Sequence, residues 1–248
     1  LAREDGSRRL GSIQPFLQLG GDASAREGWR IAVSMVYALI GDRAETLDVI
    51  RRLELCDEKT ARVQLTMADR GINAVTSTSA GRLFDGVSAL LGIRRASTFE
   101  GEASTALQYR AEAWKTEHPT MDAIAVKAPE TDAAGFLTLP TDELVRRILE
   151  QRLAGAHPDE LALEFHRQLA GQIAGAVLAA QKQTYISTAA LSGGVFQNRL
   201  LLELTVGLLE QAGLQVLTHS LVPPNDGGIA LGQAVYGLRQ LQKQKNET

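Results

Sequence analysis

The spacing of apolar residues predicts helices over most of the first two-thirds of the chain. After Gly20-Gly21-Asp22, apolar residues recur at helical spacing and stop at Gly41; they are Trp29, Ile31, Val33, Val36, Tyr37 and Ile40. Further amphipathic stretches predict helices over 43–55, 58–70 and 79–91, and from about Gly101 to Trp114. The helix over 79–91 starts in a run of N-cap residues and stops at Gly92.

The remaining third mixes short strands with helices. Two apolar runs bounded by turn residues, 123–126 and 135–139, predict strands. A helix over about 140–153 follows, and then a long helix after Pro158 whose apolar residues repeat at four-residue steps. The last quarter alternates strand 186–191, helix 197–212, strand 215–219 and helix 227–242. This alternation favours an α/β layer with parallel strands. We expect one lobe over 1–248, helix-rich over 20–118 and α/β over 120–245.

Composition and charge exclude several classes of protein. The chain has 248 residues with 26 basic and 29 acidic side chains, so its formal charge of −3 gives no overall basic footprint for nucleic acid. No apolar run approaches the roughly 20 residues that span a bilayer, so no membrane association is expected. A single cysteine, Cys56, excludes an internal disulfide and a Cys-rich zinc module. The first residues are polar and do not resemble a signal peptide, so we expect a cytoplasmic protein. The first residue is not Met, so we expect the sequence to be a piece of a longer polypeptide.

The strongest local signal for a ligand site is Ser192-Gly193-Gly194, which lies between a predicted strand and a predicted helix. The glycines permit a sharp turn and a close approach to a ligand, and N–H groups at the start of the helix face an anion. Ser192 adds a hydroxyl donor, and Asn198, about one turn inside the helix, could reach a sugar or base edge. The alternative is a connection whose glycines serve packing alone. No Gly-Lys-Ser/Thr follows, so this is not the lysine-bearing phosphate loop.

A second signal lies at Asp226, between two prolines and Gly227-Gly228 at the start of the final predicted helix. An Asp at such a position is most often an N-cap. It is also a hard ligand suited to a cation that bridges phosphates. The local pattern favours the cap.

Two further positions carry similar alternatives. Asp85 lies on an otherwise apolar helix, where it could accept hydrogen bonds from ribose hydroxyls or be a solvated charge. Gly101 follows Glu100 at a helix start, which is typical of a cap. The four histidines are not paired at helical spacing, and no Gly-x-Ser-x-Gly occurs. Of these histidines, His166 is expected to be a packed or surface residue. The sequence assigns no catalytic residue.

Five segments, in order, resemble the C-terminal part of the hydrogenase maturation carbamoyltransferases, the HypF family. They are 19–30, 77–85, 100–103, 191–202 and 223–232, and they span nearly the whole chain. Gly28 stands where the family usually has Pro, a difference expected to loosen the first helix without touching the chemistry. The resemblance implies an α/β fold that is one lobe of the actin-like, sugar-kinase- and Hsp70-like ATP-binding superfamily, similar to the tRNA threonylcarbamoyltransferases.

This resemblance implies a site between two lobes that holds ATP or carbamoyl adenylate and a divalent metal, which could be zinc, iron or magnesium. By resemblance, Gly193 and Gly194 line the phosphates and Asn198 contacts the nucleoside. Asp85 lies on the side of the site that contacts the ribose or the carbamoyl adenylate. These roles follow from the family alone.

The resemblance also implies that Gly101 closes the pocket and that Asp226 ligates the metal. The family's preceding lobe supplies two histidines four residues apart and an acidic glycine-rich segment, neither of which is in this sequence. Its acylphosphatase-like, zinc-finger and adenylate-forming domains are not in this sequence either. We therefore expect upstream domains as partners, half a metal site, and little or no activity from this lobe alone.

The implied reaction starts from carbamoyl phosphate and ATP. A carbamoyl adenylate forms, and the carbamoyl group passes to the C-terminal cysteine of a HypE-like acceptor, where it becomes a cyanide ligand for nickel–iron hydrogenase. One alternative is a docking module that binds nucleotide weakly or not at all. Another is a related threonylcarbamoyl- or O-carbamoyltransferase, whose tRNA version is weakened by the net charge of −3.

Overall fold

The computed structural model describes residues 1–3, 6–119 and 122–246. Its α-helices are α1 (Gly28–Ile40), α2 (Arg43–Arg52), α3 (Glu58–Arg70), α4 (Ala80–Leu90), α5 (Glu102–Glu117), α6 (Thr141–Leu153), α7 (Pro158–Thr184), α8 (Arg199–Gln211) and α9 (Ile229–Asn246). Three 3-10 helices are η1 (Gly21–Ala25), η2 (Gly194–Gln197) and η3 (Asp226–Gly228). The strands are β1 (Ala2–Arg3), β2 (Gly6–Ser7), β3 (Gly11–Ile13), β4 (Phe16–Leu19), β5 (Ala74–Ser77), β6 (Glu130–Thr131), β7 (Leu137–Leu139), β8 (Thr188–Ala190) and β9 (Gln215–Leu217).

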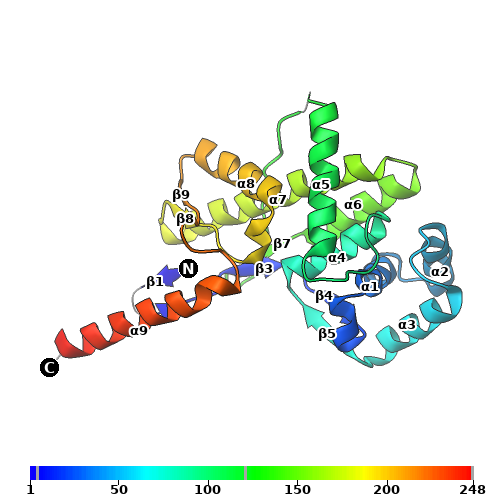
Figure 1. Ribbon diagram of the computed structural model, residues 1–248, viewed down its shortest axis with the longest axis horizontal. Helices are drawn as coiled ribbons and strands as arrows, with labels where there is room; N and C mark the ends of the chain where they lie inside the picture. The colour runs from blue at the N-terminus through cyan, green and yellow to red at the C-terminus, as the bar shows by residue number, and fades with distance from the viewer. Residues whose placement is uncertain (4–5, 120–121, 247–248) are drawn as a thin grey trace.

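The strands form small sheets around a body of helices (Figure 1). Strand β7 pairs parallel with β3 and antiparallel with β6, while β4 pairs antiparallel with β5. Strands β8 and β9 are parallel, with α8 as the connection between them. The expected helix-rich α/β architecture with a small mixed sheet is confirmed. The strands predicted at 135–139, 186–191 and 215–219 are confirmed as β7, β8 and β9, whereas the sequence pattern did not predict β1 to β6.

Helix α4 is fixed in the core by close aromatic packing. Phe84 of α4 and Phe165 of α7 are both buried, and their ring centroids lie 4.9 Å apart at an interplanar angle of 81°. At the N-terminal end of α4, the Ser79 hydroxyl accepts a hydrogen bond from the Arg82 N–H, as its N-cap sequence predicts. Asp85, one residue after Phe84, therefore has a well-defined position.

The segment 123–126 is not a strand, which corrects the prediction from its apolar run. It lies extended along α7, and the Lys127 N–H donates to the Gly171 carbonyl at 3.3 Å. A Cβ atom at Gly171 would stand 2.2 Å from the Ala125 carbonyl oxygen, and one at Gly175 would stand 1.8 Å from that of Lys127. The two glycines thus form a groove on α7 that the extended segment occupies.

Helix α9 projects from the helical body (Figure 1). Its large apolar side chains are exposed to solvent; they are Ile229, Leu231, Val235, Tyr236, Leu238 and Leu241. The helix begins at Ile229, two residues after the expected start, because the preceding turn is the 3-10 helix η3. Over the described residues, no helix is both long enough and apolar enough to cross a bilayer.

Candidate functional site

The N-terminal ends of four helices converge on one cavity of about 680 Å³. Its walls come from the starts of α4 and α5, from η2 and the residue before α8, and from the turn before α9. The lining residues are Ser79, Gly81, Arg82, Phe84, Asp85, Glu100, Gly101, Ser104, Thr105, Gln108, Gly194, Val195, Gln197, Asn198, Asn225 and Asp226. N–H groups at helix N-termini are not used within the helix, and the helix dipole favours negative charge there. The cavity is therefore suited to a polyanion.

Five residues singled out from the sequence line this cavity: Asp85, Gly101, Gly194, Asn198 and Asp226. They come from segments up to 141 residues apart in the chain, from Asp85 to Asp226. Ser192 and Gly193 are not among the lining residues and lie immediately before them in the loop.

The two glycine-containing loops lie side by side. The Gly193 N–H donates to the Pro224 carbonyl at 2.9 Å, and the φ angle of 99° at Gly193 is one that L side chains rarely adopt. The Leu191 N–H donates to the Leu217 carbonyl at 2.9 Å, which brings the carboxyl ends of β8 and β9 together. Ligands of α/β sheets bind beyond this edge of parallel strands.

Asp85 is a buried carboxyl in the wall of the cavity, with 9% of its surface exposed. Burial raises the pKa of Asp85 to about 6, although the Arg82 guanidinium opposes this shift. The Arg82 Nη1 lies 2.8 Å from the Asp85 Oδ2 and also donates to the Ala25 carbonyl at 2.7 Å. Asp85 can accept hydrogen bonds from a ligand hydroxyl, or take up a proton close to neutral pH.

Gly28 lies against the backbone of this candidate site residue. Gly28 is the first residue of α1 and is buried against α4. A Cβ atom at Gly28 would stand 2.7 Å from the Asp85 carbonyl oxygen. The missing side chain lets α1 approach the backbone of Asp85 directly.

Asn198 is the N-cap of α8 and does not lie one turn inside it, as the sequence suggested. Its Oδ1 accepts from the Leu201 N–H at 3.0 Å, and its Nδ2 donates to the His166 Nε2 at 2.9 Å. The His166 Nδ1 donates to the Ala162 carbonyl at 2.7 Å, and burial lowers the pKa of His166 to about 4. A neutral His166 thus fixes Asn198, and the Asn198 amide already has partners for both its oxygen and its nitrogen.

Asp226 is not the cap that the local pattern favoured. The Asn225 Oδ1 accepts from the Gly227 N–H at 3.1 Å and caps η3. The Asp226 carboxylate is exposed at the edge of the cavity, and no side-chain hydrogen bond or ion pair to it is found within the described part of the chain. Asp226 is therefore free to offer oxygen to a hard cation. Within residues 1–3, 6–119 and 122–246, no three His, Cys, Asp or Glu side chains are grouped so that they could hold a metal ion.

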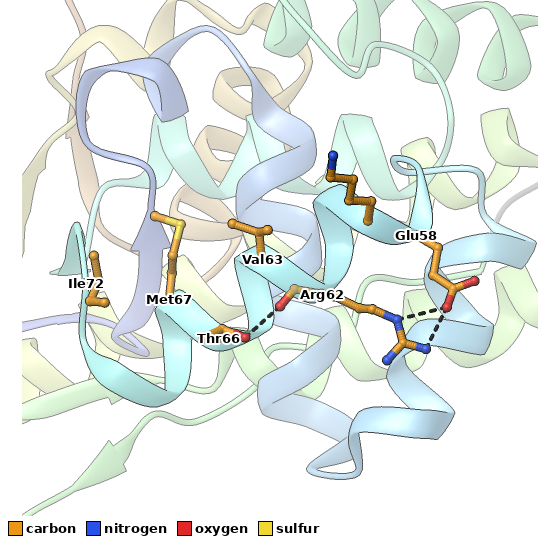
Figure 2. A pocket seen from close by; sticks show the side chains of 7 residues that line it. Glu58, Arg62, Val63, Thr66, Met67 and Ile72 are labelled. Atoms are coloured by element: carbon orange, nitrogen blue, oxygen red, sulfur yellow. Dashed lines mark hydrogen bonds and ion pairs between the residues drawn. The ribbon is translucent and has the colours of Figure 1, made fainter.

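A second hollow runs along α3 and holds none of the candidate residues. Figure 2 shows its side chains along that helix and, after the helix, Ile72, with the Arg62 guanidinium paired to the Glu58 carboxylate at 2.6 Å. The hollow has a volume of about 660 Å³ and is lined by Glu58, Lys59, Arg62, Val63, Thr66, Met67 and Ile72. Its mainly aliphatic walls and single exposed ion pair do not suit a polyanion, so the cavity at the helix N-termini is the better candidate.

A family profile described as "Carbamoyltransferase, Kae1-like Domain, second subdomain" matches residues 1–233. Among individual proteins, the chain is 32% identical to carbamoyltransferase HypF of Rhodobacter capsulatus over 96% of this chain and 29% of that protein. It is 29% identical to a probable carbamoyltransferase HypF of Methanocaldococcus jannaschii over 95% of this chain and 29% of that protein. It is also 33% identical to a HypF homolog of Cupriavidus necator, over 94% of this chain and 58% of that protein.

Two solved structures share the fold. One is full-length HypF in a phosphate- and nucleotide-bound form, with a TM-score of 0.79 and 26% identity over 94% of this chain and 29% of that one. HypF of T. kodakarensis gives a TM-score of 0.79 at 24% identity, over 95% of this chain and 30% of that one. The chain thus spans less than a third of most of these relatives. With a family profile matching 233 residues in order, the chain belongs to the HypF carbamoyltransferase family, as the second subdomain of the Kae1-like domain.

Proposed function

We propose that this chain is the nucleotide-binding lobe of an ATP-dependent carbamoyl-transfer site. In the proposed reaction, carbamoyl phosphate and ATP give carbamoyl adenylate with release of phosphate and pyrophosphate, and the carbamoyl group then passes to the C-terminal cysteine of a HypE-like acceptor with release of AMP. The observation that carries the proposal is the convergence of four helix N-termini and two adjacent glycine loops on one cavity. A HypF relative of similar fold is reported in a phosphate- and nucleotide-bound form, which agrees with such a ligand.

The proposed roles follow the chemistry of each lining group. Backbone N–H groups at Gly194 and the following turn would donate to phosphate oxygens, and Gly194 has no side chain to obstruct the approach. The Asp85 carboxylate would accept hydrogen bonds from ribose hydroxyls, and Gly101 would form the opposite wall. Asn198 would hold the loop in place through His166 and Leu201, and its amide keeps one N–H and one oxygen lone pair with which it would contact the nucleoside.

A divalent cation fits this site at Asp226, whose exposed carboxylate can supply one ligand. Zinc, iron and magnesium remain the proposed candidates, and the other ligands would come from phosphate oxygens and from a preceding lobe. Such a cation would neutralise phosphate charge and polarise the transferred group. This chain's own part is to hold Asp226 at the cavity edge through the Asn225-capped turn.

A preceding lobe is supported by two features of this chain. Many residues that line the cavity are exposed, among them Ser79, Gly101, Gly194 and Asp226, so the cavity is open on one side. Helix α9 starts at that cavity and carries an apolar stripe of Leu231, Val235, Leu238 and Leu241, each between 45% and 61% exposed.

The experiment is calorimetric titration of a non-hydrolysable ATP analogue into the chain, with the upstream lobe supplied. We expect Gly194→Val to weaken binding at least tenfold, since the branched side chain would occupy the path of the phosphates. The melting temperature should hardly change, because only the Gln197 side chain comes within 4 Å of a Cβ atom at position 194. Unchanged affinity in this variant would refute the placement of the phosphates.

The cation is tested by Asp226→Asn in the same complex. We expect metal content, measured by mass spectrometry after dialysis, to fall while stability stays within about 1 kcal/mol, since the carboxylate makes no contact that the fold needs. A variant that loses stability but keeps its metal would show that Asp226 is structural.

The second candidate is a partner-docking module without its own catalysis, and the exposed stripe of α9 favours it. This function predicts a tight complex with the upstream lobe and no ATP-analogue binding at millimolar concentration. The calorimetric titration with the ATP analogue therefore distinguishes the two functions, since only the first predicts binding of the analogue.

A further inference from the structure

Ser192 and His219 form a hydrogen-bonded pair next to the candidate cavity. The Ser192 Oγ and the His219 Nε2 are 2.9 Å apart. Ser192 follows β8 and His219 follows β9, so the pair lies just beyond the carboxyl ends of two paired parallel strands. The residues are 27 positions apart in sequence, and the pattern of the chain gave no reason to link them.

The pair links the two loops that reach the cavity. A second link is the 2.9 Å hydrogen bond from the Gly193 N–H to the Pro224 carbonyl. In the first loop, Ser192 and Gly193 lead directly into Gly194, and in the second, Pro224 leads into Asn225 and Asp226; these three following residues line the cavity. The two links therefore fix the turn at Gly194, proposed to bind phosphate, relative to the turn at Asp226, proposed to bind the cation.

Neither member of the pair is placed to react with a ligand in the cavity. Ser192 and His219 are absent from the cavity wall, while their chain neighbours are part of it. A catalytic serine–histidine pair needs the hydroxyl oxygen at the reacting atom, which this placement does not provide.

We propose that His219 is a positioning residue, which holds Ser192 and through it presents the Gly193–Gly194 turn to a polyphosphate. This inference rests on the proposed function and extends it to a residue outside the cavity. Glycine is the most flexible residue, so a loop with two adjacent glycines has many conformations when nothing restrains it. A side-chain link immediately before the turn lowers that freedom before the ligand binds and lowers the entropy lost on binding.

The test is a double-mutant cycle on affinity for the ATP analogue, measured in the complex with the upstream lobe. Ser192→Ala and His219→Phe each remove one partner, and we expect each to weaken binding about 5- to 30-fold. The double variant should be no weaker than the weaker single variant, because both changes remove one interaction. His219→Gln keeps a side-chain amide that can bond to Ser192, and we expect it to stay within threefold of wild type. Additive losses in the double variant would overturn the proposal.

A second measurement does not depend on nucleotide. Hydrogen exchange of the Gly193 and Gly194 amides, followed by NMR in the ligand-free chain, should become at least fivefold faster in His219→Phe and remain near wild type in His219→Gln. Equal exchange in all three proteins would overturn the positioning role. If exchange responds as expected but no protein binds the ATP analogue, the proposed function fails while the loop link stands.

Discussion

Two buried ionisable side chains lie on either side of Phe84 and are shifted in opposite directions. The pKa of Asp85 is raised to about 6 and that of His166 is lowered to about 4, in both cases mainly because burial disfavours the charged form. The Phe84 and His166 rings are 5.3 Å apart at 74°, so His166 is part of the same packed layer. A neutral His166 is what allows its Nε2 to accept from Asn198.

This arrangement predicts how stability depends on pH. In the unfolded chain His166 would titrate at about 6.5, but in the folded chain at about 4. Between these values the unfolded state binds the extra proton, so the free energy of unfolding falls as the pH is lowered, by up to about 3 kcal/mol from this residue. Asp85 acts in the opposite sense: the folded state binds its proton first, so its burial becomes less costly as the pH falls from about 6.

Replacing His166 separates its effect on the pH dependence of stability from that of Asp85. Urea denaturation of His166→Gln between pH 7 and 4.5 should show less loss of stability on acidification than wild type, even though the variant is less stable at pH 7. An identical slope for His166→Gln would contradict a neutral, buried His166.

Position 28 tests the contact between α1 and the backbone of Asp85. The 2.7 Å separation between a Cβ atom at Gly28 and the Asp85 carbonyl is too short without movement of one helix. We expect Gly28→Ala to lower the free energy of unfolding by about 1–3 kcal/mol in urea denaturation, because the obstruction is backbone. Gly81→Ala, near the start of α4, meets only the Ser79 hydroxyl at 3.8 Å and should change stability little.

Among whole elements, the helices and the strands β7, β8 and β9 were predictable from sequence, whereas the strands β1 to β6 were not. The stretches around 58–70 and 79–91 carry apolar periodicity and recognisable ends, and α3 and α4 lie there. The apolar run at 123–126 shows why such a signal fails for strands. A run of four residues does not tell whether its partner is a strand or the glycine groove of α7, because that depends on residues some 45 positions away.

The glycine groove makes a prediction of its own. A Cβ atom at Gly175 would stand 1.8 Å from the Lys127 carbonyl, so Gly175→Ala must displace the extended segment from α7. We expect a loss of about 1–3 kcal/mol and faster proteolysis of the segment 122–129. Gly207→Ala in α8 is the matched control, because a Cβ atom there meets nothing within 4 Å and helix propensity favours Ala. Equal stability of Gly175→Ala and wild type would show that the segment is only loosely held.

The candidate site was predictable as a set of residues but not as a geometry. Its glycines and acids occur in ordered motifs, and five of them do line one cavity. What local pattern could not supply is which side chains already have partners. Asn198 is occupied by His166, while Asn225 takes the capping role expected of Asp226, and both outcomes depend on contacts outside each motif.

For the whole molecule, the open cavity and the exposed stripe of α9 are linked features. The turn that carries Asp226 leads directly into α9, so movement of this helix would move the proposed cation ligand. An α-helix held mainly at one end, with four large apolar side chains in water, lacks the packing that normally stabilises helices in proteins. A lobe that covers the stripe would order α9 and fix the position of Asp226 in a single step.

If the stripe is covered by an upstream lobe, placing a charged residue in the stripe should weaken binding of that lobe. Leu238→Lys should weaken binding of the upstream lobe at least tenfold by calorimetry, since burial of a leucine contributes about 1.5–3 kcal/mol and an unpaired lysine opposes it. Because the stripe is already exposed in this chain, the variant should keep the wild-type melting temperature when alone. Gln233→Lys lies on the opposite face by helical spacing and serves as the control. If Leu238→Lys instead abolishes a dimer of the chain and leaves lobe binding intact, the stripe pairs two copies and the cavity must be closed by another surface.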